Sequence, residues 1–386
     1  MLTLDSRRVA IVADLLEERW PSMDLVADML MSQLQGGGVR ATLMRPGFTS
    51  AGLAVDNGRG GTPPTIQRIA HRFWSYPRWL PQQPAADVYH IVDHSYAHLA
   101  HELPAGRVVV TCHDTDAFRA LLQSGERVAG LPRWLVRRVL GGLRLAAAVV
   151  CDSEATRSEL VSHQLVPLER TLVLPIGVHP ECRPAPDRDA DASAEGLTGP
   201  RGSADLLHVG STIPRKRIDV LLEALAIVAR KRADARLWRV GGEFTFEQAR
   251  QARELGVEER ITVLPFVSRA VLAAMYRRAA LVLLPSEREG FGLPVIESMA
   301  CGTPILCSDL PVLREVGGDA AEYCAVGEPS SWATRICELL GERDHQPAKW
   351  SARRSSGLMR SAAFTWSRYA SGMQDVYERV AALTVR

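Results

Sequence analysis

The chain has 386 residues, which is enough for two domains of ordinary size. It is 46% apolar and 23% charged, a composition typical of a globular protein and unlike a disordered or fibrous one. Its 46 Lys and Arg against 44 Asp and Glu give a net charge of +2, which argues against a dedicated nucleic-acid-binding protein.

Short β-branched runs alternate with amphipathic segments along the chain, and the series occurs twice. Predicted strands of the first series lie at 8–14, 87–94, 107–114, 147–153 and 171–177. Those of the second series lie at 205–211, 235–242, 261–267, 280–287 and 303–309. Runs that are apolar throughout are typical of parallel strands covered on both faces by crossover helices. The sequence therefore predicts two α/β halves, each Rossmann-like.

The segment 181–205 between the two series is rich in Pro, Ala, Asp and Gly and has almost no large apolar residues. We interpret it as a flexible linker between an N-terminal domain at 1–180 and a C-terminal domain at 206–363, which residues 364–386 follow. It contains Asp187, Asp189 and Asp191 in Asp-x-Asp spacing. Because a metal-binding carboxylate pair needs a rigid scaffold, no metal site is predicted there.

Neither the cysteines nor the apolar runs indicate export or a membrane span. The seven cysteines are scattered and form no C-x-x-C pair, so neither a zinc ribbon nor a redox dithiol is predicted. The N-terminal run has its charges beside and after a very short apolar stretch, unlike a signal peptide. The longest uncharged apolar runs are too short to cross a bilayer. We expect a cytoplasmic protein with reduced thiols.

The segment 281–316 carries the most chemical information. A predicted strand runs into a loop with two glycines, Gly290 and Gly292, and Pro294 then suits the first position of a helix. Free N–H groups at such a helix start attract a phosphate, and ligands bind at this edge of an open α/β sheet. A carboxylate repels phosphate, so Glu289 and Glu297 suit sugar hydroxyls. The alternative is a solvated Glu289 and a Glu297 that complements the helix dipole.

A second informative segment lies at 206–225. A predicted strand ends in Gly210-Ser211, and a short loop then delivers Arg215, Lys216 and Arg217 directly before a helix. Cations are unfavourable at a helix start, so an anion such as a diphosphate should compensate for them. The alternative is an exposed basic turn. Only three of the 46 basic residues are lysines, which makes Lys216 the hardest to attribute to composition.

Together these segments resemble the family 4 (group 1) glycosyltransferases of the GT-B fold. The most specific match is SEREGFGLPVIESMACGTP at 286–304, and VGSTIPRKR at 209–217, RVGG at 239–242 and VLPFVSRAVLAAMY at 263–276 match in order and spacing. In the first half the resemblance is looser. It implies two Rossmann-like domains whose parallel sheets face each other across a cleft, and a C-terminal helix that returns to the N-terminal domain.

The resemblance also implies a role for each candidate residue. Glu289 would hold hydroxyls of the donor sugar, Glu297 the ribose hydroxyls, and Arg215 with Lys216 the diphosphate. His113 would face the donor sugar from the first domain, whereas without the family it is interpreted as a histidine satisfied at a strand end. The other implied donor-binding residues are Gly210, Ser211, Val267 near the base, Gly290, Phe291, Gly292 and Leu293.

Two positions depart from the family. Its first loop usually carries Gly-Gly, whereas residues 13–24 contain no glycine, which puts acceptor contacts there in doubt. An arginine often follows the glycine at 210, and here it is Ser211. The diphosphate would then depend on Arg215 and Lys216, as in members with a P-R-K signature, several of which are mannosyltransferases.

The implied reaction is retaining transfer of a hexose from a nucleotide-diphosphate sugar to a hydroxyl of a glycan or lipid-linked acceptor, without metal or cofactor. GDP-mannose is favoured from the P-R-K signature, with UDP-hexoses next. A GT-B-like sugar-nucleotide epimerase and a catalytically silent relative that acts as a scaffold stay open. Intact Glu289, Lys216 and Glu297 argue against the silent relative.

Two segments of the first half combine arginines with interfacial aromatic residues, at 65–81 and 131–145. Such surfaces lie on anionic headgroups, which predicts peripheral contact with the inner face of a membrane. The alternative is that both are ordinary amphipathic helices, because arginine is abundant throughout this chain.

Overall fold

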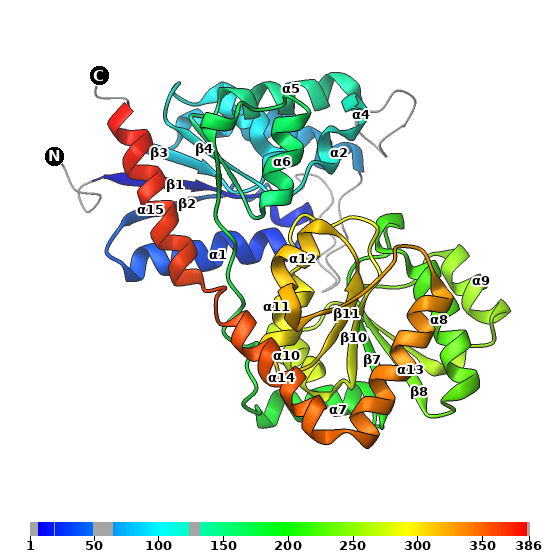
Figure 1. Cartoon of the computed structure of the whole chain (residues 1–386). Helices are drawn as coiled ribbons and strands as arrows, with labels where there is room; N and C mark the ends of the chain where they lie inside the picture. Colours follow the sequence, from blue (N-terminus) through cyan, green and yellow to red (C-terminus); the bar gives the residue numbers. More distant parts are fainter. Residues whose placement is uncertain (1–6, 19, 49–64, 123–131, 384–386) are drawn as a thin grey trace. The chain divides into compact units, whose positions relative to one another are not determined.

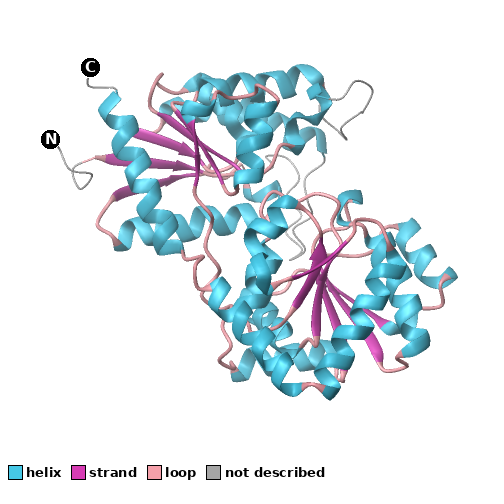
Figure 2. Cartoon of the chain, in the orientation of Figure 1, coloured by secondary structure: helices cyan, strands magenta, loops and turns pink. Residues whose placement is uncertain are grey.

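The computed structural model describes residues 7–18, 20–48, 65–122 and 132–383. The chain divides into two compact units (Figure 1). The first comprises Met1–Gly177 with Trp366–Arg386, and the second Val178–Thr365. Each unit contains a parallel six-stranded sheet with helices on its faces (Figure 2). The predicted pair of Rossmann-like domains is confirmed.

In the first unit the strand order is β2-β1-β3-β4-β5-β6. The strands are β1 (Arg8–Val12), β2 (Arg40–Met44), β3 (Val88–Ile91), β4 (Val108–Cys112), β5 (Ala148–Cys151) and β6 (Thr171–Val173). The helices are α1 (Pro21–Gly36), α2 (Thr65–Ala70), α3 (Tyr76–Trp79), α4 (Arg119–Leu122), α5 (Arg133–Leu145), α6 (Glu154–Ser162) and α15 (Trp366–Leu383). A π-helical turn at His71–Ser75 joins α2 to α3.

The C-terminal helix α15 completes the first unit, packing on β3, β4 and α1 (Figure 1). The Tyr377 hydroxyl lies 2.8 Å from Nδ1 of His90, and the Tyr369 hydroxyl lies 3.4 Å from the Thr111 hydroxyl. All four side chains are buried. These polar contacts specify how the helix docks, because a buried hydroxyl without a partner is unfavourable.

In the second unit the strand order is β12-β11-β10-β7-β8-β9. The strands are β7 (Ala204–Val209), β8 (Ala235–Val240), β9 (Ile261–Leu264), β10 (Leu281–Leu284), β11 (Ile305–Ser308) and β12 (Glu322–Cys324). The helices are α7 (Arg188–Thr198), α8 (Ile218–Lys231), α9 (Phe246–Glu254), α10 (Arg269–Arg278), α11 (Leu293–Ala300), α12 (Pro311–Gly317), α13 (Pro329–His345) and α14 (Pro347–Ser361). Helices α8 and α13 lie on one face of the sheet and α10 and α11 on the other (Figure 1).

Ten of these strands coincide with the runs predicted from the sequence, and the two that were missed are β2 and β12. Both lie at the end of a sheet. β2 reads RATLM and is mostly exposed or half-buried, and β12 has only three residues. An edge strand needs no continuous apolar run, so the pattern that identifies central strands does not identify it.

The segment 181–205 is not a flexible linker throughout, as the sequence suggested, because it contains helix α7 in the second unit. The Asp187 side chain caps the helix by accepting from the N–H of Ala190. Ala190 and Ala194 are buried, and Arg277 of α10 forms an ion pair with Asp191 at 2.8 Å. Alanines suffice for close packing of two helices, which a search for large apolar residues overlooks. The Asp-x-Asp spacing thus provides a cap and an ion pair.

Candidate donor-binding site

The turn before α11 has the geometry that its glycines predicted. Gly292 has φ +94°, and a Cβ there would lie 2.6 Å from Cδ2 of Leu313, so only glycine fits without strain. The helix begins at Leu293, one residue before the predicted start at Pro294. Pro294 has no N–H and the Val295 N–H donates to the carbonyl of Gly292 at 2.8 Å, so what the helix start offers is its aligned peptide dipoles. They form a partial positive end beside the loop that carries Glu289.

Glu289 lies in this loop with its carboxylate largely buried. It accepts a hydrogen bond from Nζ of Lys216 at 2.6 Å and from the Ser286 hydroxyl at 2.7 Å, and Nη1 of Arg215 lies 3.5 Å from it. Burial alone would raise the pKa of Glu289, but Lys216 and Arg215 lower it overall. The side chain is therefore ionised at neutral pH. Two cations and one carboxylate meet directly before α11.

The three cations that the sequence grouped at the start of α8 separate in the structure. Arg217 has φ +48° and pairs with Asp219 through Nη2 at 2.7 Å. Arg215 and Lys216 instead point to Glu289, and Arg215 also donates to the carbonyl of Arg288 at 2.9 Å. Only two of the three cations thus belong to the site. The pattern of three adjacent cations does not by itself distinguish Arg217 from the other two.

Glu297 lies one turn into α11, where it is 3% exposed. It accepts from the Tyr276 hydroxyl at 2.9 Å, and Nη1 of Arg269 lies 3.5 Å away. Burial raises the pKa of Glu297, and Arg269 opposes that shift. Val267 precedes Arg269 in the loop that leads into α10 and is half-buried. Sequence reasoning missed Arg269, which brings this loop and Glu297 together.

Gly210 and Ser211 follow β7, and their turn lies against the turn after β8. The N–H of Gly210 donates to the carbonyl of Val240 at 2.9 Å. A Cβ on Gly241, which has φ +130°, would lie 2.0 Å from the Gly210 carbonyl oxygen. Two peptide chains can approach this closely only when one of them has glycine. Gly210 also lies beside Lys216, whose Cδ would be 3.7 Å from a Cβ on Gly210.

His113, in the first unit, follows β4 at the carboxyl edge of its sheet. Nδ1 lies 2.5 Å from Oδ2 of Asp152, and Nε2 lies 2.7 Å from the carbonyl oxygen of Val92. Burial would lower the pKa of His113, but the Asp152 carboxylate, with Asp93 nearby, raises it to about 10. Both ring nitrogens are engaged within the first unit. This geometry agrees with the alternative interpretation, a histidine at a strand end whose two ring nitrogens both have hydrogen-bond partners.

The stability that His113 confers is expected to depend on pH. Its pKa is higher in the folded chain than the ordinary 6.5, so the imidazolium stabilises the fold fully below about pH 6.5. That stabilisation declines as the pH rises toward 10. We expect the difference in the free energy of unfolding between wild type and His113→Gln to be larger at pH 6.5 than at pH 9.5, as measured by urea denaturation. A difference that does not change with pH would contradict the assignment.

The same edge of the first sheet holds further buried acids that the sequence did not single out. Both carboxylate oxygens of Asp14 have no hydrogen-bond partner among the described residues. Burial and the nearby Asp93 raise the pKa of Asp14. Burial would also raise the pKa of Asp93, but His94 and His113 lower it overall. Each acid lies at the C-terminal end of a predicted strand, at 8–14 or 87–94, and this position was the available signal.

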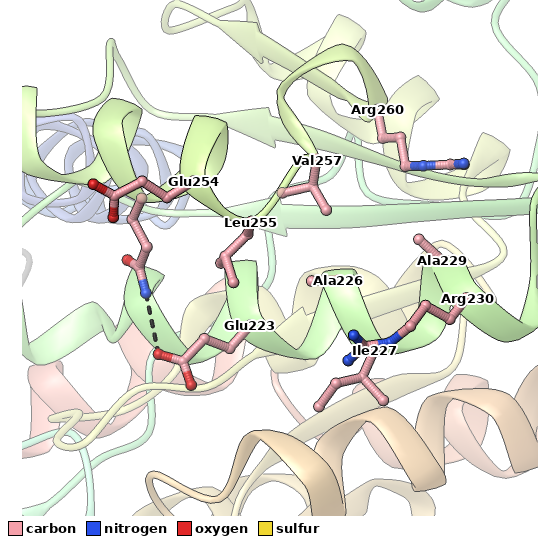
Figure 3. Close-up of a pocket in the computed structure, with 11 residues that line it drawn as sticks. Glu223, Ala226, Ile227, Ala229, Arg230, Glu254, Leu255, Val257 and Arg260 are labelled. Atoms are coloured by element: carbon pink, nitrogen blue, oxygen red, sulfur yellow. Dashed lines mark hydrogen bonds between the residues drawn. The ribbon is translucent and has the colours of Figure 1, made fainter.

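A pocket of about 780 Å³ lies elsewhere in the second unit, between α8 and α9 (Figure 3). The Gln251 side chain there donates to Glu223 at 3.1 Å. Its lining also includes Ile227, Arg230 and Arg260. None of the residues predicted for donor binding lines it.

Comparison with known proteins agrees with this architecture. The family described as Glycosyl transferases group 1 matches residues 191–354, and Glycosyltransferase Family 4 matches residues 26–181. A D-inositol 3-phosphate glycosyltransferase of Thermobispora bispora is 34% identical over 257 residues, which cover 62% of this chain and 58% of the relative. The protein of that name in Kineococcus radiotolerans is 30% identical over 266 residues, or 63% of this chain and 60% of the relative. Each match thus spans less than two thirds of the relative's length.

Solved structures match over almost the whole chain. The sucrose-phosphate synthase of Thermosynechococcus elongatus has a TM-score of 0.77 at 19% identity and covers 98% of this chain and 100% of its own. Anabaena HepE, in complex with UDP and glucose, has a TM-score of 0.72 at 15% identity. The match covers 97% of this chain and 100% of the HepE chain. At these identities the likeness shows the fold. The two family matches and the shared fold establish that the chain belongs to the family 4 (group 1) glycosyltransferases of the GT-B fold.

Proposed function

We propose that this protein transfers a hexose from a nucleotide-diphosphate sugar to a hydroxyl acceptor. The observation that carries the proposal is the convergence of Lys216 and Arg215 on Glu289, directly before the N-terminus of α11. Two cations beside the positive end of a helix suit a diphosphate. The carboxylate beside it suits the hydroxyls of the attached sugar.

The same residues would supply catalysis. When the glycosidic bond to the diphosphate breaks, negative charge develops on the diphosphate, where Lys216, Arg215 and the positive end of α11 would stabilise it. We propose retention of anomeric configuration, with attack on the face that the diphosphate leaves. The leaving phosphate would take the acceptor proton. Positioning of the two substrates then supplies the rest of the rate enhancement.

The nucleoside half of the donor would lie further along the same edge. Glu297 would accept hydrogen bonds from the ribose hydroxyls, and Val267 would contact the base. Glu297 already holds two donors, the Tyr276 hydroxyl and Arg269. A ribose could share the carboxylate with these two donors, since the two carboxylate oxygens offer about four lone-pair sites.

Two donor classes are the candidates. GDP-mannose is favoured by the P-R-K signature at 214–216, and UDP-hexoses are supported by the UDP and glucose bound to Anabaena HepE. We expect one class of nucleotide sugar to raise the melting temperature clearly, since a ligand at 100 times its dissociation constant stabilises by about 2.7 kcal/mol.

The screen should be run in EDTA, because we propose that the cations make a metal unnecessary. Stabilisation that survives EDTA, with Lys216→Ala abolishing it, supports the assignment. A response that needs added manganese or magnesium would refute the metal-independent mechanism. If none of the nucleotide sugars raises the melting temperature, the proposed function is contradicted.

The acceptor class can be decided by product analysis. The relatives are named for D-inositol 3-phosphate, which makes a phosphorylated cyclitol one candidate. A glycan or lipid-linked saccharide is the other, as the resemblance implied. Release of nucleoside diphosphate only when one of these is added would identify it. A new sugar nucleotide formed from the donor alone would instead indicate an epimerase.

We further propose that the first unit binds a membrane surface peripherally. Trp74 is 42% and Trp134 54% exposed, and their rings lie in edge contact with centroids 6.1 Å apart. Arg133 and Arg137 are exposed on the same helix as Trp134. None of the helices in the described part of the chain has the length and apolar character that crossing a bilayer requires. Leu131, at the start of the second predicted segment, lies outside the described residues.

The structure corrects the predicted surface at 65–81, since Phe73 and Tyr76 are buried, and Arg72 is buried too, with its Nη2 donating to the carbonyl of Ser95. The informative variants are therefore Trp74→Ser with Trp134→Ser, and Arg133→Glu with Arg137→Glu. Both should lower co-sedimentation with phosphatidylglycerol vesicles, and added salt should weaken wild-type binding. Phe246→Ser, an exposed aromatic of the second unit, is the control. If the wild-type protein stays in the supernatant with these vesicles at low salt, membrane contact is refuted.

A further inference from the structure

A charged side chain lies inside the second sheet. Arg239, in β8, is 0% exposed. Its Nη2 donates to the carbonyls of Gly210 at 2.8 Å and Gly241 at 3.2 Å. Nε and Nη1 have no hydrogen-bond partner among the described residues. Burial lowers the pKa of Arg239 to about 10, so the side chain is still a cation at neutral pH. Burial of an unpaired cation is unfavourable, which calls for an explanation.

The residues around Arg239 compensate its charge only in part: the Phe244 ring lies 5.5 Å from the guanidinium carbon, and Glu243 opposes the effect of burial on the pKa of Arg239. His208 of β7 is its register partner, is equally buried, and has no hydrogen-bond partner for either ring nitrogen among the described residues. Burial, with Arg239 and Lys216 nearby, lowers the pKa of His208 to about 3, so it is neutral. Lys216 also lies beside Gly210 and adds a second cation. Positive charge therefore gathers around the Gly210 turn.

The hydrogen bond from Arg239 also fixes the direction of one peptide group. The Gly210–Ser211 peptide is trans, as are all those described, so the Ser211 N–H points opposite to the Gly210 carbonyl. That carbonyl points to the buried guanidinium. The Ser211 N–H therefore points away from Arg239, and it makes no hydrogen bond to another described residue. Close contact with Gly241 limits how far the turn can move.

We propose that Arg239 is a positioning residue for the donor diphosphate. It holds the Gly210 carbonyl inward, directs the Ser211 N–H to a phosphate oxygen and places a buried positive charge behind it. This inference rests on the proposed function. It also explains how the chain manages with Ser211 where relatives often have arginine, because the neighbouring strand supplies the charge.

Selective labelling tests the N–H directly on the wild-type protein. Gly-Ser occurs only at 202–203 and 210–211, so 13C-carbonyl glycine with 15N serine leaves two amide signals. Titration with UDP, GDP or pyrophosphate should shift the Ser211 proton downfield and leave Ser203 in place. Binding of a nucleoside diphosphate, verified by calorimetry, with an unmoved Ser211 signal would overturn the proposal.

Substitution tests the arginine. Arg239→Met removes the charge and the hydrogen bonds and should weaken nucleoside-diphosphate binding about 10-fold, the effect of losing one charge-assisted contact. Nucleoside monophosphate binding should change much less. Arg239→Lys keeps the charge and should recover part of the affinity. Trp238→Phe perturbs the same buried strand without changing charge and is the control for a merely structural effect.

The outcomes separate the two levels of the argument. If the wild type binds no nucleoside diphosphate, the proposed function fails. If the wild type binds and a folded Arg239→Met retains its affinity, only the role of Arg239 fails. Equal losses for diphosphate and monophosphate, matched by Trp238→Phe, would assign Arg239 to stability alone. If Arg239→Met does not fold, Arg239→Lys takes its place as the test of the arginine, and the labelled wild type still decides whether the Ser211 N–H meets the phosphate.

Discussion

Lys216→Ala is expected to leave the fold intact and to reduce kcat by roughly 10²–10³, the usual effect of removing one group that stabilises charge in a transition state. Lys216 is the nearest cation to Glu289, at 2.6 Å, whereas Arg215 lies at 3.5 Å. Loss of Lys216 therefore removes the stronger of the two contacts at the proposed diphosphate position. Steady-state release of nucleoside diphosphate measures the effect.

A second lysine of the same helix serves as a matched control. Lys231 ends the same helix, α8, and is exposed. Lys231→Ala should keep wild-type turnover, and Lys216→Arg should restore part of it, since the charge remains. Thermal unfolding of all three variants verifies that they are folded. Near-normal kcat in a folded Lys216→Ala would remove Lys216 from the site.

Glu289→Gln is expected to lower kcat about 10²-fold and to strengthen binding of nucleoside diphosphate. The carboxylate holds Lys216 and Arg215 in the unliganded chain, so it competes with a diphosphate for them. The amide removes that competition but no longer accepts charge-assisted hydrogen bonds from the donor sugar. Affinity and turnover should therefore change in opposite directions, as calorimetry and kinetics together can measure.

Glu287→Gln is the control, because Glu287 lies two residues earlier and pairs with Arg288 instead. It should change neither quantity. Stability offers a second check on Glu289: its pKa is lowered in the folded chain, so its contribution is present above about pH 4.5 and is lost as the pH falls further. A Glu289→Gln variant whose affinity and kcat fall together would contradict the proposed competition.

The central strands, the two-domain architecture and the turn before α11 could be predicted because each depends on local pattern. Buried parallel strands need continuous apolar runs, and the turn needs glycine at 292. Helix α7 could not be predicted in this way, because it packs through Ala190 and Ala194 and gains its ion pair from α10, 86 residues away.

In the candidate site, sequence identified the residues but not their partners. The spacing singled out Arg215, Lys216 and Glu289, whereas the separation of Arg217 toward Asp219 depends on one positive φ angle. Arg239 was overlooked because its strand has the pattern of an ordinary core strand. An arginine in the middle of such a strand was nevertheless a visible signal.

The most direct test of the proposed donor site is a crystal structure of the wild-type protein with UDP or GDP. The diphosphate should lie at the N-terminus of α11 within hydrogen-bond distance of Lys216 and Arg215, and the ribose hydroxyls should reach Glu297. A nucleotide bound in the pocket between α8 and α9, or away from Lys216 altogether, would contradict the account.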